Sequence, residues 1–125
     1  MRIDTMFKTY DVTLSLEVFP PKVQSSFDSV KLAVEQLAAS RPDYMSVTYG
    51  AGGGISNNTI DIASLIQNSL DTVALAHMTC VSSSRAEIAS LLDRLRERGI
   101  KNILALRGDI PEGMVFPEAG YYKYA

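Results

Sequence analysis

Residues 72–106 read TVALAHMTCVSSSRAEIASLLDRLRERGIKNILAL, and the order of elements within this stretch decides the fold. Its two ends, Thr72–Met78 and Asn102–Leu106, are short apolar segments rich in β-branched and aliphatic residues. Neither segment alternates cleanly between apolar and polar residues, which is typical of strands covered on both faces in a parallel sheet. Because the residues between them have helical periodicity, the stretch predicts a strand, a crossover helix and a second, parallel strand.

The helix predicted between these strands has clear start and stop signals. Ser84 and Glu87 have the spacing of a capping box, in which the hydroxyl and the carboxylate bind backbone amides of the first turn. Arginines crowd the last turn, where cations complement the helix dipole, and Gly99 follows as a residue able to adopt positive φ. We therefore predict that the helix ends at Arg98 or within a residue or two of it. One face carries the apolar side chains Ile88, Leu91, Leu92 and Leu95.

The same unit occurs earlier in the chain. Thr13–Val18 and Tyr44–Thr48 are similar apolar segments, and helical patterns run from Phe27 to Ala38, after a Ser25-Ser26 cap, and from Asn57 to about Leu70. The four strand centres lie near residues 16, 46, 75 and 104, at intervals of 30, 29 and 29 residues. A repeat of this kind indicates either a doubly wound open sheet or a (β/α)8 barrel.

Two features favour the barrel over the open sheet. The spacing of the strands is even along the whole chain. A nucleotide-binding open sheet usually has a glycine fingerprint after its first strand, whereas here that strand runs into Phe19-Pro20-Pro21-Lys22. The predicted fold class is therefore α/β, of the (β/α)8 barrel family.

Composition excludes several classes of function. The 125 residues include 12 Lys+Arg and 14 Asp+Glu, a net charge of −2, which lacks the positive excess of a nucleic-acid binder. Hydrophobic residues make up 46% and charged residues 21%, as in a globular protein. A single cysteine, Cys80, excludes an internal disulfide and favours the cytoplasm. The chain has neither a signal-peptide pattern nor an apolar run near the roughly 20 residues of a membrane span.

Polar residues occur where each predicted strand ends. Glu17 lies on the first strand, Thr48 on the second and His77 on the third, and Arg107 and Asp109 follow the fourth. In a barrel the carboxyl ends of the strands converge on one face, where active sites of this architecture are built. We therefore expect these five side chains to surround a single cavity.

Each of these residues also has a simpler interpretation. Glu17 sits among apolar residues, where a carboxylate is expensive to bury, so it is either functional or part of a buried ion pair. His77, the only histidine, is a satisfied core residue or a group that hydrogen-bonds or catalyses. Thr48 by itself is weak evidence for a site, because threonine is a good strand former. We interpret Cys80 as a small apolar residue, and no metal site is expected.

Two glycine-containing motifs have competing interpretations. In Arg107-Gly108-Asp109 the glycine lets the backbone approach a ligand closely. The same tripeptide is an integrin-recognition signal in extracellular proteins, but the expected cytoplasmic location argues against that function. The run Gly50–Gly54 offers amides that suit a phosphate, yet it lacks the Lys-Ser/Thr ending of a P-loop. A flexible loop is the alternative interpretation of this run.

Four strings between residues 14 and 111 together identify a family: LEVFPPK, SVTYGAGG, AHMTC and ALRGDIP. In this order and at these spacings they resemble the flavin-dependent methylenetetrahydrofolate reductases. The resemblance implies a (β/α)8 barrel that holds FAD at the carboxyl ends of its strands. It also implies ping-pong reduction of 5,10-methylenetetrahydrofolate to 5-methyltetrahydrofolate with hydride from NADH or NADPH, a step of one-carbon metabolism that supplies methionine.

The resemblance assigns roles to individual residues. Glu17 matches the general acid that assists opening of the methylene bridge, and apolar surroundings would favour the protonated form it needs. Asp109 matches the aspartate that contacts the folate pterin close to the flavin, where its charge tunes the ring. Thr48 matches a position near both cofactor and substrate. The further positions matched to the flavin and nicotinamide sites are Tyr49, Ala51, His77, Arg107, Gly108, Tyr124 and Ala125.

Length sets this chain apart from the family pattern. A complete (β/α)8 barrel needs about 250 residues, so we interpret residues 1–125 as the N-terminal half of one barrel domain, with four strands and three to four helices. Such a half-barrel leaves two strand edges unpaired and an apolar interior exposed. The full-length protein is expected to form a homo-oligomer.

Two other functions remain open. One is a non-catalytic half-barrel that self-associates, or that binds flavin or folate without turnover. The other is an open-sheet phosphate binder that uses Gly50–Gly54.

Overall fold

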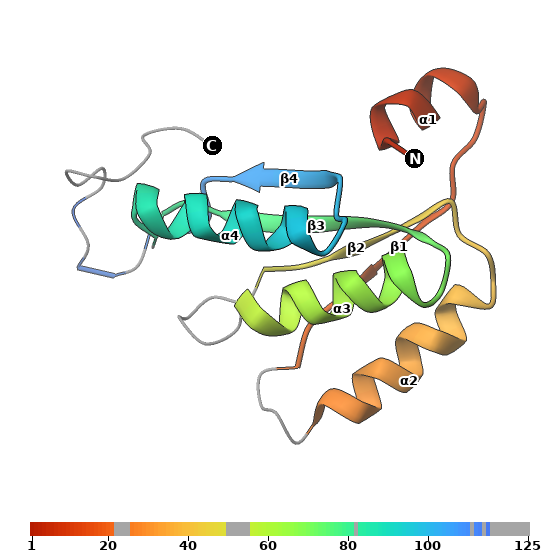
Figure 1. Ribbon diagram of the computed structural model, residues 1–125, viewed down its shortest axis with the longest axis horizontal. Coiled ribbons are helices and arrows are strands. Elements are labelled where there is room, and N and C mark those ends of the chain that lie inside the picture. Colours follow the sequence, from red (N-terminus) through yellow and green to blue (C-terminus); the bar gives the residue numbers. More distant parts are fainter. Residues whose placement is uncertain (22–25, 50–55, 82, 111, 114, 116–125) are drawn as a thin grey trace.

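The structure is a computed structural model of the chain, and it describes residues 1–125 except 22–25, 50–55, 82, 111, 114 and 116–125. Strands and helices alternate after a short N-terminal helix (Figure 1). In chain order the elements are α1 (Ile3–Thr9), β1 (Ser15–Val18), α2 (Phe27–Ala38), β2 (Tyr44–Val47), α3 (Ser56–Asn68), β3 (Val73–Thr79), α4 (Arg85–Glu97) and β4 (Asn102–Leu106). All four strands are parallel and lie in the order β1-β2-β3-β4.

The two faces of the sheet differ in exposure. In β3, Ala74 and Ala76 are fully buried, whereas the alternating positions Leu75, His77 and Thr79 are only partly buried. Because side chains of a strand point alternately to opposite faces, one face of the sheet is covered and the other is open among the described residues.

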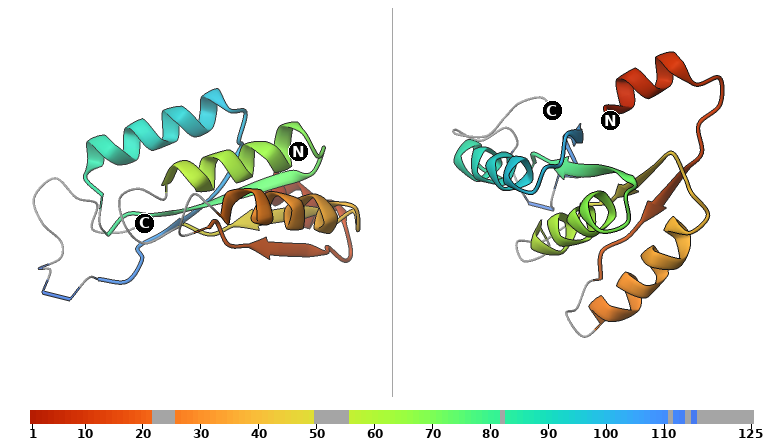
Figure 2. Two further views of the ribbon diagram at one scale, coloured as in Figure 1. Left: turned by 90° about the horizontal axis from the view of Figure 1, so that it is seen from below. Right: turned by 45° about the vertical axis from the view of Figure 1, so that its right-hand side comes forward.

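Helices α2, α3 and α4 all cover the same face of the sheet, as the views in Figure 1 and Figure 2 show. The core lies between these helices and the covered face of the strands. Its fully buried side chains include Val34, Met45, Val47, Ile60, Ile62, Ile66 and Leu95. A doubly wound sheet carries helices on both faces and reverses its strand order at a switch point, and the described sheet does neither. The described part of the chain is therefore a singly wound series of βα units, consistent with part of a (β/α)8 barrel.

The four predicted strands and three predicted helices are confirmed, with bounds that differ by at most two residues. The capping box of α4 is also confirmed, because the Ser84 hydroxyl accepts from the Glu87 amide at 3.3 Å and the Ser84 amide donates to Glu87 Oε2 at 2.6 Å. The hydrogen bonds from Ser84 lower the pKa of the Glu87 carboxyl. Gly99, just beyond the helix, has a φ of +74°.

The serine cap predicted at Ser25-Ser26 for α2 is at the right position, but the capping hydrogen bond is not formed by Ser26. Ser26 is the N-cap residue, but its side chain makes no capping hydrogen bond and its ψ is 2°. A hydroxyl caps best from an extended N-cap conformation, such as that of Ser84 with a ψ of 163°. Ser25 lies outside the described residues.

Helix α1 was not predicted from the sequence. Ile3 and Met6 are buried, and the Phe7 ring contacts the Tyr44 ring edge to face at 6.0 Å between centroids. A helix of 7 residues is too short to be stable by itself, so tertiary contacts stabilise it. The apolar spacing of Ile3, Met6, Phe7 and Tyr10 was the available signal.

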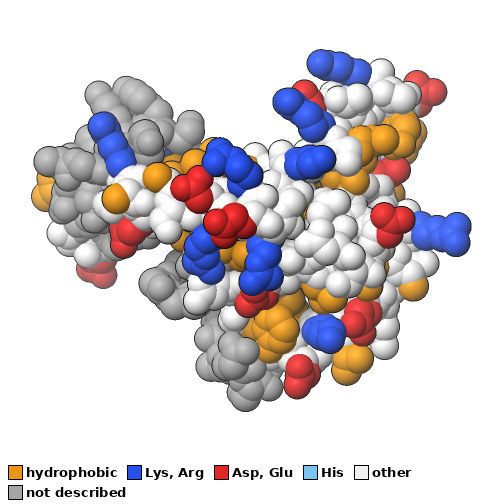
Figure 3. Space-filling view, in the orientation of Figure 1, with side chains coloured by type: hydrophobic (Ala, Val, Ile, Leu, Met, Phe, Trp, Pro, Cys, Tyr) orange, Lys and Arg blue, Asp and Glu red, His pale blue; other side chains and the backbone are white. Residues whose placement is uncertain are grey.

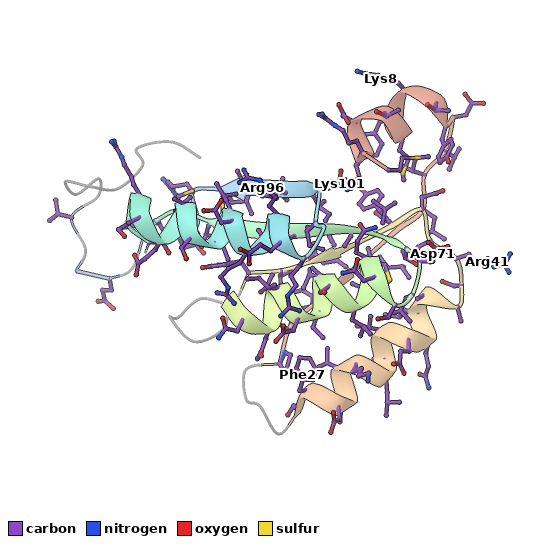
Figure 4. All side chains as sticks on the ribbon, viewed as in Figure 1. Lys8, Phe27, Arg41, Asp71, Arg96 and Lys101 are labelled. Atoms are coloured by element: carbon purple, nitrogen blue, oxygen red, sulfur yellow. The ribbon has the colours of Figure 1, made fainter. Side chains whose placement is uncertain are left out.

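Asn102 joins α1 to the amino end of the sheet. Its side chain is buried, and its Oδ1 accepts from the Ile3 amide at 2.9 Å. Its Nδ2 donates to the Met1 carbonyl at 3.2 Å and to the Ala74 carbonyl at 3.3 Å. The turns before β2 and β3 lie at the same end and contain Arg41 and Asp71, which have positive φ (Figure 4). The amino end of the sheet is therefore closed by α1 and these turns.

No helix among the described residues combines the length and the apolar composition needed to cross a bilayer.

The capping box predicts a specific loss of stability. Ser84→Ala should lower the free energy of unfolding by about 1 kcal/mol, because the Glu87 amide loses its acceptor. Urea denaturation monitored by circular dichroism measures this. Ser90→Ala, on an exposed position of the same helix, is the control and should be neutral or slightly stabilising. Equal effects of the two variants would contradict the role of the cap.

The Asn102 side chain predicts a larger loss. Asn102→Ala should destabilise the fold by about 1–3 kcal/mol, because the Ile3 amide and the Ala74 carbonyl lose a buried partner. Asn57→Ala is the matched control, since Asn57 is exposed and, among the described residues, its side chain only accepts from Arg94; it should change stability by at most about 0.5 kcal/mol. Both values come from urea denaturation. A cost for Asn102→Ala no larger than the control would show that α1 is held by apolar contacts alone.

Candidate active site

The carboxyl ends of the strands carry the polar residues predicted from the sequence. Glu17 lies in β1 and His77 in β3, while Thr48 directly follows β2 and Arg107 directly follows β4. Because the strands are parallel and neighbours in register, these positions lie at one end of the sheet, where the carboxyl ends of the strands meet. The predicted site residues Ala51, Tyr124 and Ala125, and the run Gly50–Gly54, lie outside the described residues.

Three side chains from three adjacent strands form a cluster at this end of the sheet. Glu17 pairs in register with Ser46 of β2, and the Ser46 hydroxyl donates to Glu17 Oε2 at 3.2 Å. His77 Nε2 lies 3.6 Å from the same oxygen. The structure therefore brings the predicted acid and the predicted cofactor-binding histidine into one cluster of Glu17, Ser46 and His77, which we call the carboxyl cluster.

Of the two interpretations of Glu17, the buried ion pair is not met among the described residues. Its side chain is 49% exposed, whereas that of His77 is 12% exposed. The apolar neighbours Leu16 and Val18 are adjacent in the strand, so they point to the opposite, helix-covered face. Within the described chain the carboxyl group is thus open on one side, and a ligand that covers the open face would be needed to desolvate it.

His77 is placed as one of its two interpretations expects, and the other stays a prediction. The ring is largely buried, as expected of a core residue, yet its Nε2 faces a carboxylate oxygen. The pair is charged on both sides only when the imidazole is protonated. His77 therefore contacts the predicted acid directly, which its sequence position alone did not indicate.

Ser46 is the site residue that sequence reasoning missed. It is 7% exposed, and serine in a strand is not a recognisable catalytic signal by itself. A signal was available, because Ser46 lies two residues before Thr48 and so on the same face of the strand.

The backbone after β2 is held from two sides. The Thr48 amide donates to the Val18 carbonyl at 3.1 Å, and the buried Thr59 hydroxyl of α3 donates to the Thr48 carbonyl at 3.0 Å. Tyr49 follows, partly buried, and packs against the core. Helix α3 and strand β1 thereby hold the backbone at Thr48, which carries the predicted site side chain.

The segment after β4 is fastened to the end of β3. The Arg107 carbonyl accepts from the amides of Cys80 at 3.2 Å and Val81 at 2.8 Å, and the exposed Arg107 side chain donates from Nε to the Gly108 carbonyl at 3.0 Å. Cys80 is buried, as expected of a small apolar residue, and burial raises the pKa of its thiol.

Gly108 makes a close approach, but to the protein itself. Its φ is +83°, and a Cβ at this position would lie 3.0 Å from both Thr79 Cβ and Val81 Cγ1. Gly108 therefore meets a packing requirement at the end of β3, and its close approach to a ligand stays a prediction. Only glycine meets both the backbone angle and the space.

Asp109 is exposed and lies three residues beyond the end of β4. Strands β1 and β4 are at opposite edges of the described sheet, three strand spacings apart, or about 14 Å. Glu17 therefore lies on one edge strand, and Asp109 follows the other.

The opposite side of the molecule has a different character. Figure 3 shows Lys and Arg interspersed with Asp and Glu over the helices, and Arg98 lies 3.8 Å from Asp61 there. Such a mixed surface is typical of a solvated face. Among the described residues, no three His, Cys, Asp or Glu side chains gather as a metal site.

Fold and site together define the class of protein. A singly wound series of parallel βα units with a carboxyl cluster at the carboxyl ends of its strands is the arrangement in which βα-barrel enzymes build their sites. The family model described as "Methylenetetrahydrofolate reductase" matches residues 2–125. The chain therefore belongs to the methylenetetrahydrofolate reductase family.

Three relatives show how much of the family protein the chain covers. Methylenetetrahydrofolate reductase (NADH) 1 of Arabidopsis thaliana is 33% identical over 112 residues, which are 90% of this chain and 19% of the relative. Methylenetetrahydrofolate reductase 1 of Schizosaccharomyces pombe is 38% identical over 99 residues, 78% of this chain and 16% of the relative. The 5,10-methylenetetrahydrofolate reductase of Escherichia coli is 32% identical over 107 residues, 86% of this chain and 36% of the relative. The chain thus spans about a third of the bacterial relative and less than a fifth of the other two.

The close packing at Gly108 predicts the effect of a substitution. Gly108→Ala should destabilise the chain by well over 1 kcal/mol, because alanine meets both the positive φ and the atoms of Thr79 and Val81. Gly113→Ala is the matched control, since Gly113 has a φ of +78° and no atom of the described residues lies within 4 Å of an added Cβ. Thermal and urea denaturation measure both variants. Equal losses would mean that backbone strain alone, without the packing, determines the effect.

Proposed function

We propose that the protein containing this chain reduces 5,10-methylenetetrahydrofolate to 5-methyltetrahydrofolate, using FAD and a reduced nicotinamide nucleotide. The observation that carries this proposal is the carboxyl cluster, in which Glu17 is held by Ser46 and His77 at the carboxyl ends of the strands. The names of the plant relatives, which include NADH, support a nicotinamide nucleotide as the hydride donor.

The residues at the carboxyl ends of the strands suit a flavin dinucleotide in their chemistry. The exposed Arg107 guanidinium suits a phosphate, and the Thr48 hydroxyl and the His77 ring offer hydrogen bonds. Leu104 and Leu106 are each 38% exposed on the open face and suit the apolar part of such a ligand. When bound, FAD would supply the hydride transfer between the nucleotide and the folate. We propose Tyr49, Ala51, Gly108, Tyr124 and Ala125 as further parts of this site.

Glu17 is proposed as the general acid. Protonation of the folate nitrogen that leaves the methylene bridge needs a carboxyl group within hydrogen-bond reach of the ligand, and Glu17 is exposed on the open face. A ligand covering that face would exclude water from the carboxyl and favour its protonated form. Asp109, at the other edge of the sheet, is proposed to contact the pterin, and Thr48 to contact the substrate as well.

The proposed architecture is a complete (β/α)8 barrel of which these four strands are one half. Among the described residues, β1 pairs only with β2 and β4 only with β3, so each leaves one edge for a further strand. A barrel has no such edges, and a full one needs about 250 residues. We propose that residues 1–125 belong to a single domain of this kind in a cytoplasmic homo-oligomer, and the one buried cysteine, Cys80, suits a reducing compartment.

The same unpaired edges support a second candidate, a non-catalytic half-barrel that self-associates or binds flavin or folate without turnover. Formation of 5-methyltetrahydrofolate distinguishes the reductase from the non-catalytic half-barrel.

The proposed activity predicts a division between two half-reactions. The protein containing this chain, reconstituted with FAD, should be yellow, and NADH or NADPH should bleach its flavin absorbance. Glu17→Gln should keep FAD binding and nucleotide oxidation with an artificial electron acceptor. Its reduction of 5,10-methylenetetrahydrofolate should fall by about 100-fold or more, because the acid is lost.

Glu97→Gln, on the exposed side of α4, is the matched control and should retain both reactions. A protein that binds FAD but never forms 5-methyltetrahydrofolate supports the non-catalytic candidate. A protein without a flavin chromophore after reconstitution overturns the proposed cofactor.

A further inference from the structure

Both neighbours of the Glu17 carboxyl group approach the same oxygen atom. The Ser46 hydroxyl donates to Oε2 at 3.2 Å, and His77 Nε2 lies 3.6 Å from Oε2. Oε1 has no protein partner among the hydrogen bonds and ion pairs of the described residues. The two oxygens of one carboxyl group are therefore inequivalent: Oε2 has two protein neighbours, and Oε1 has no hydrogen-bond or ion-pair partner among the described residues.

Ser46 lies on a strand that is held on both sides. Strand β2 pairs on both sides, with β1 and with β3, and Ser46 is 7% exposed. Its flanking residues Met45 and Val47 are fully buried in the core. The short serine side chain on such a strand keeps its hydroxyl close to one place. The Glu17 side chain is longer and half exposed, so its carboxyl group needs a partner to fix its position.

Ser46 is not arranged as a nucleophile. In a nucleophilic triad the imidazole contacts the hydroxyl and the carboxylate orients the imidazole. Here Glu17 Oε2 lies between Ser46 and His77, so the hydroxyl donates a hydrogen bond to the carboxyl oxygen and not to the imidazole. The role open to this hydroxyl is to hold the carboxyl group.

We propose that Ser46 is a positioning residue that holds Glu17 Oε2 as a hydrogen-bond acceptor and so leaves the acidic proton on Oε1, facing the ligand. This inference rests on the proposed function of Glu17 as a general acid. When Oε1–H gives its proton to the leaving nitrogen of the folate, the O–H bond breaks, an N–H bond forms and the carboxylate keeps the electron pair. The Ser46 hydrogen bond becomes charge-assisted at that moment and stabilises the new carboxylate.

Kinetics on the full-length, FAD-loaded protein test this role with Ser46→Ala and Ser46→Thr. Ser46→Ala should lower the turnover number for 5,10-methylenetetrahydrofolate by roughly 10- to 100-fold, the usual effect of losing a hydrogen bond to a charged group. The KM for the folate and the rate of flavin reduction by NADH should stay within about twofold, since Glu17 acts only on the folate. Ser46→Thr keeps the hydroxyl and should restore most of the turnover.

Ser90→Ala in α4 is the matched control, and FAD binding with a cooperative thermal transition establishes that each variant is folded. Equal slowing of both half-reactions by Ser46→Ala would indicate general disruption and overturn the proposal. Unchanged folate turnover in Ser46→Ala would also overturn it.

A second measurement keeps this inference separate from the proposed function. If the unaltered protein forms no 5-methyltetrahydrofolate, the proposed function fails, and the side-chain coupling constants of Glu17 in nuclear magnetic resonance decide the role of Ser46. One dominant rotamer in the unaltered protein and in Ser46→Thr, with averaging in Ser46→Ala, supports positioning. Identical couplings in all three overturn it.

Discussion

The candidate site depends above all on the parallel pairing of β2 with both of its neighbours. That pairing places Ser46 directly opposite Glu17 on one side and aligns it with Leu75, two residues before His77, on the other. A shift of one residue in either register would turn one of these side chains to the helix-covered face, because successive residues point to opposite faces. The buried residues Met45 and Val47 oppose such a shift of one residue, because it would turn them to the open face.

The helices on one face make the other face available. α2, α3 and α4 bury the same side of the sheet, so the open side can present Glu17, His77 and partly exposed leucines to a ligand or to further strands (Figure 2). At the amino end, α1 and Asn102 close the sheet. Stability and chemistry are thus divided between the two ends of the strands, as is usual in βα architectures.

Local signals were sufficient where a single segment decides its own structure. The capping box of Ser84 and Glu87 and the positive φ of Gly99 depend on residues within one helix turn, so their spacing predicted them correctly. Ser26 shows the limit of such signals, because the conformation around it, rather than its side chain, determines whether a cap forms. Helix α1 was missed because its stability comes from contacts with Tyr44 and Asn102, far along the chain.

The sequence by itself determined the βα repeat, the family and the set of strand-end residues, because periodicity, turn signals and four collinear motifs are all properties of neighbouring residues. Only the tertiary structure decided that Glu17 is half exposed, that His77 faces it and that Ser46 holds the same oxygen. These three side chains come from different strands, and the pairing register between strands, which no single segment contains, sets the distances between them.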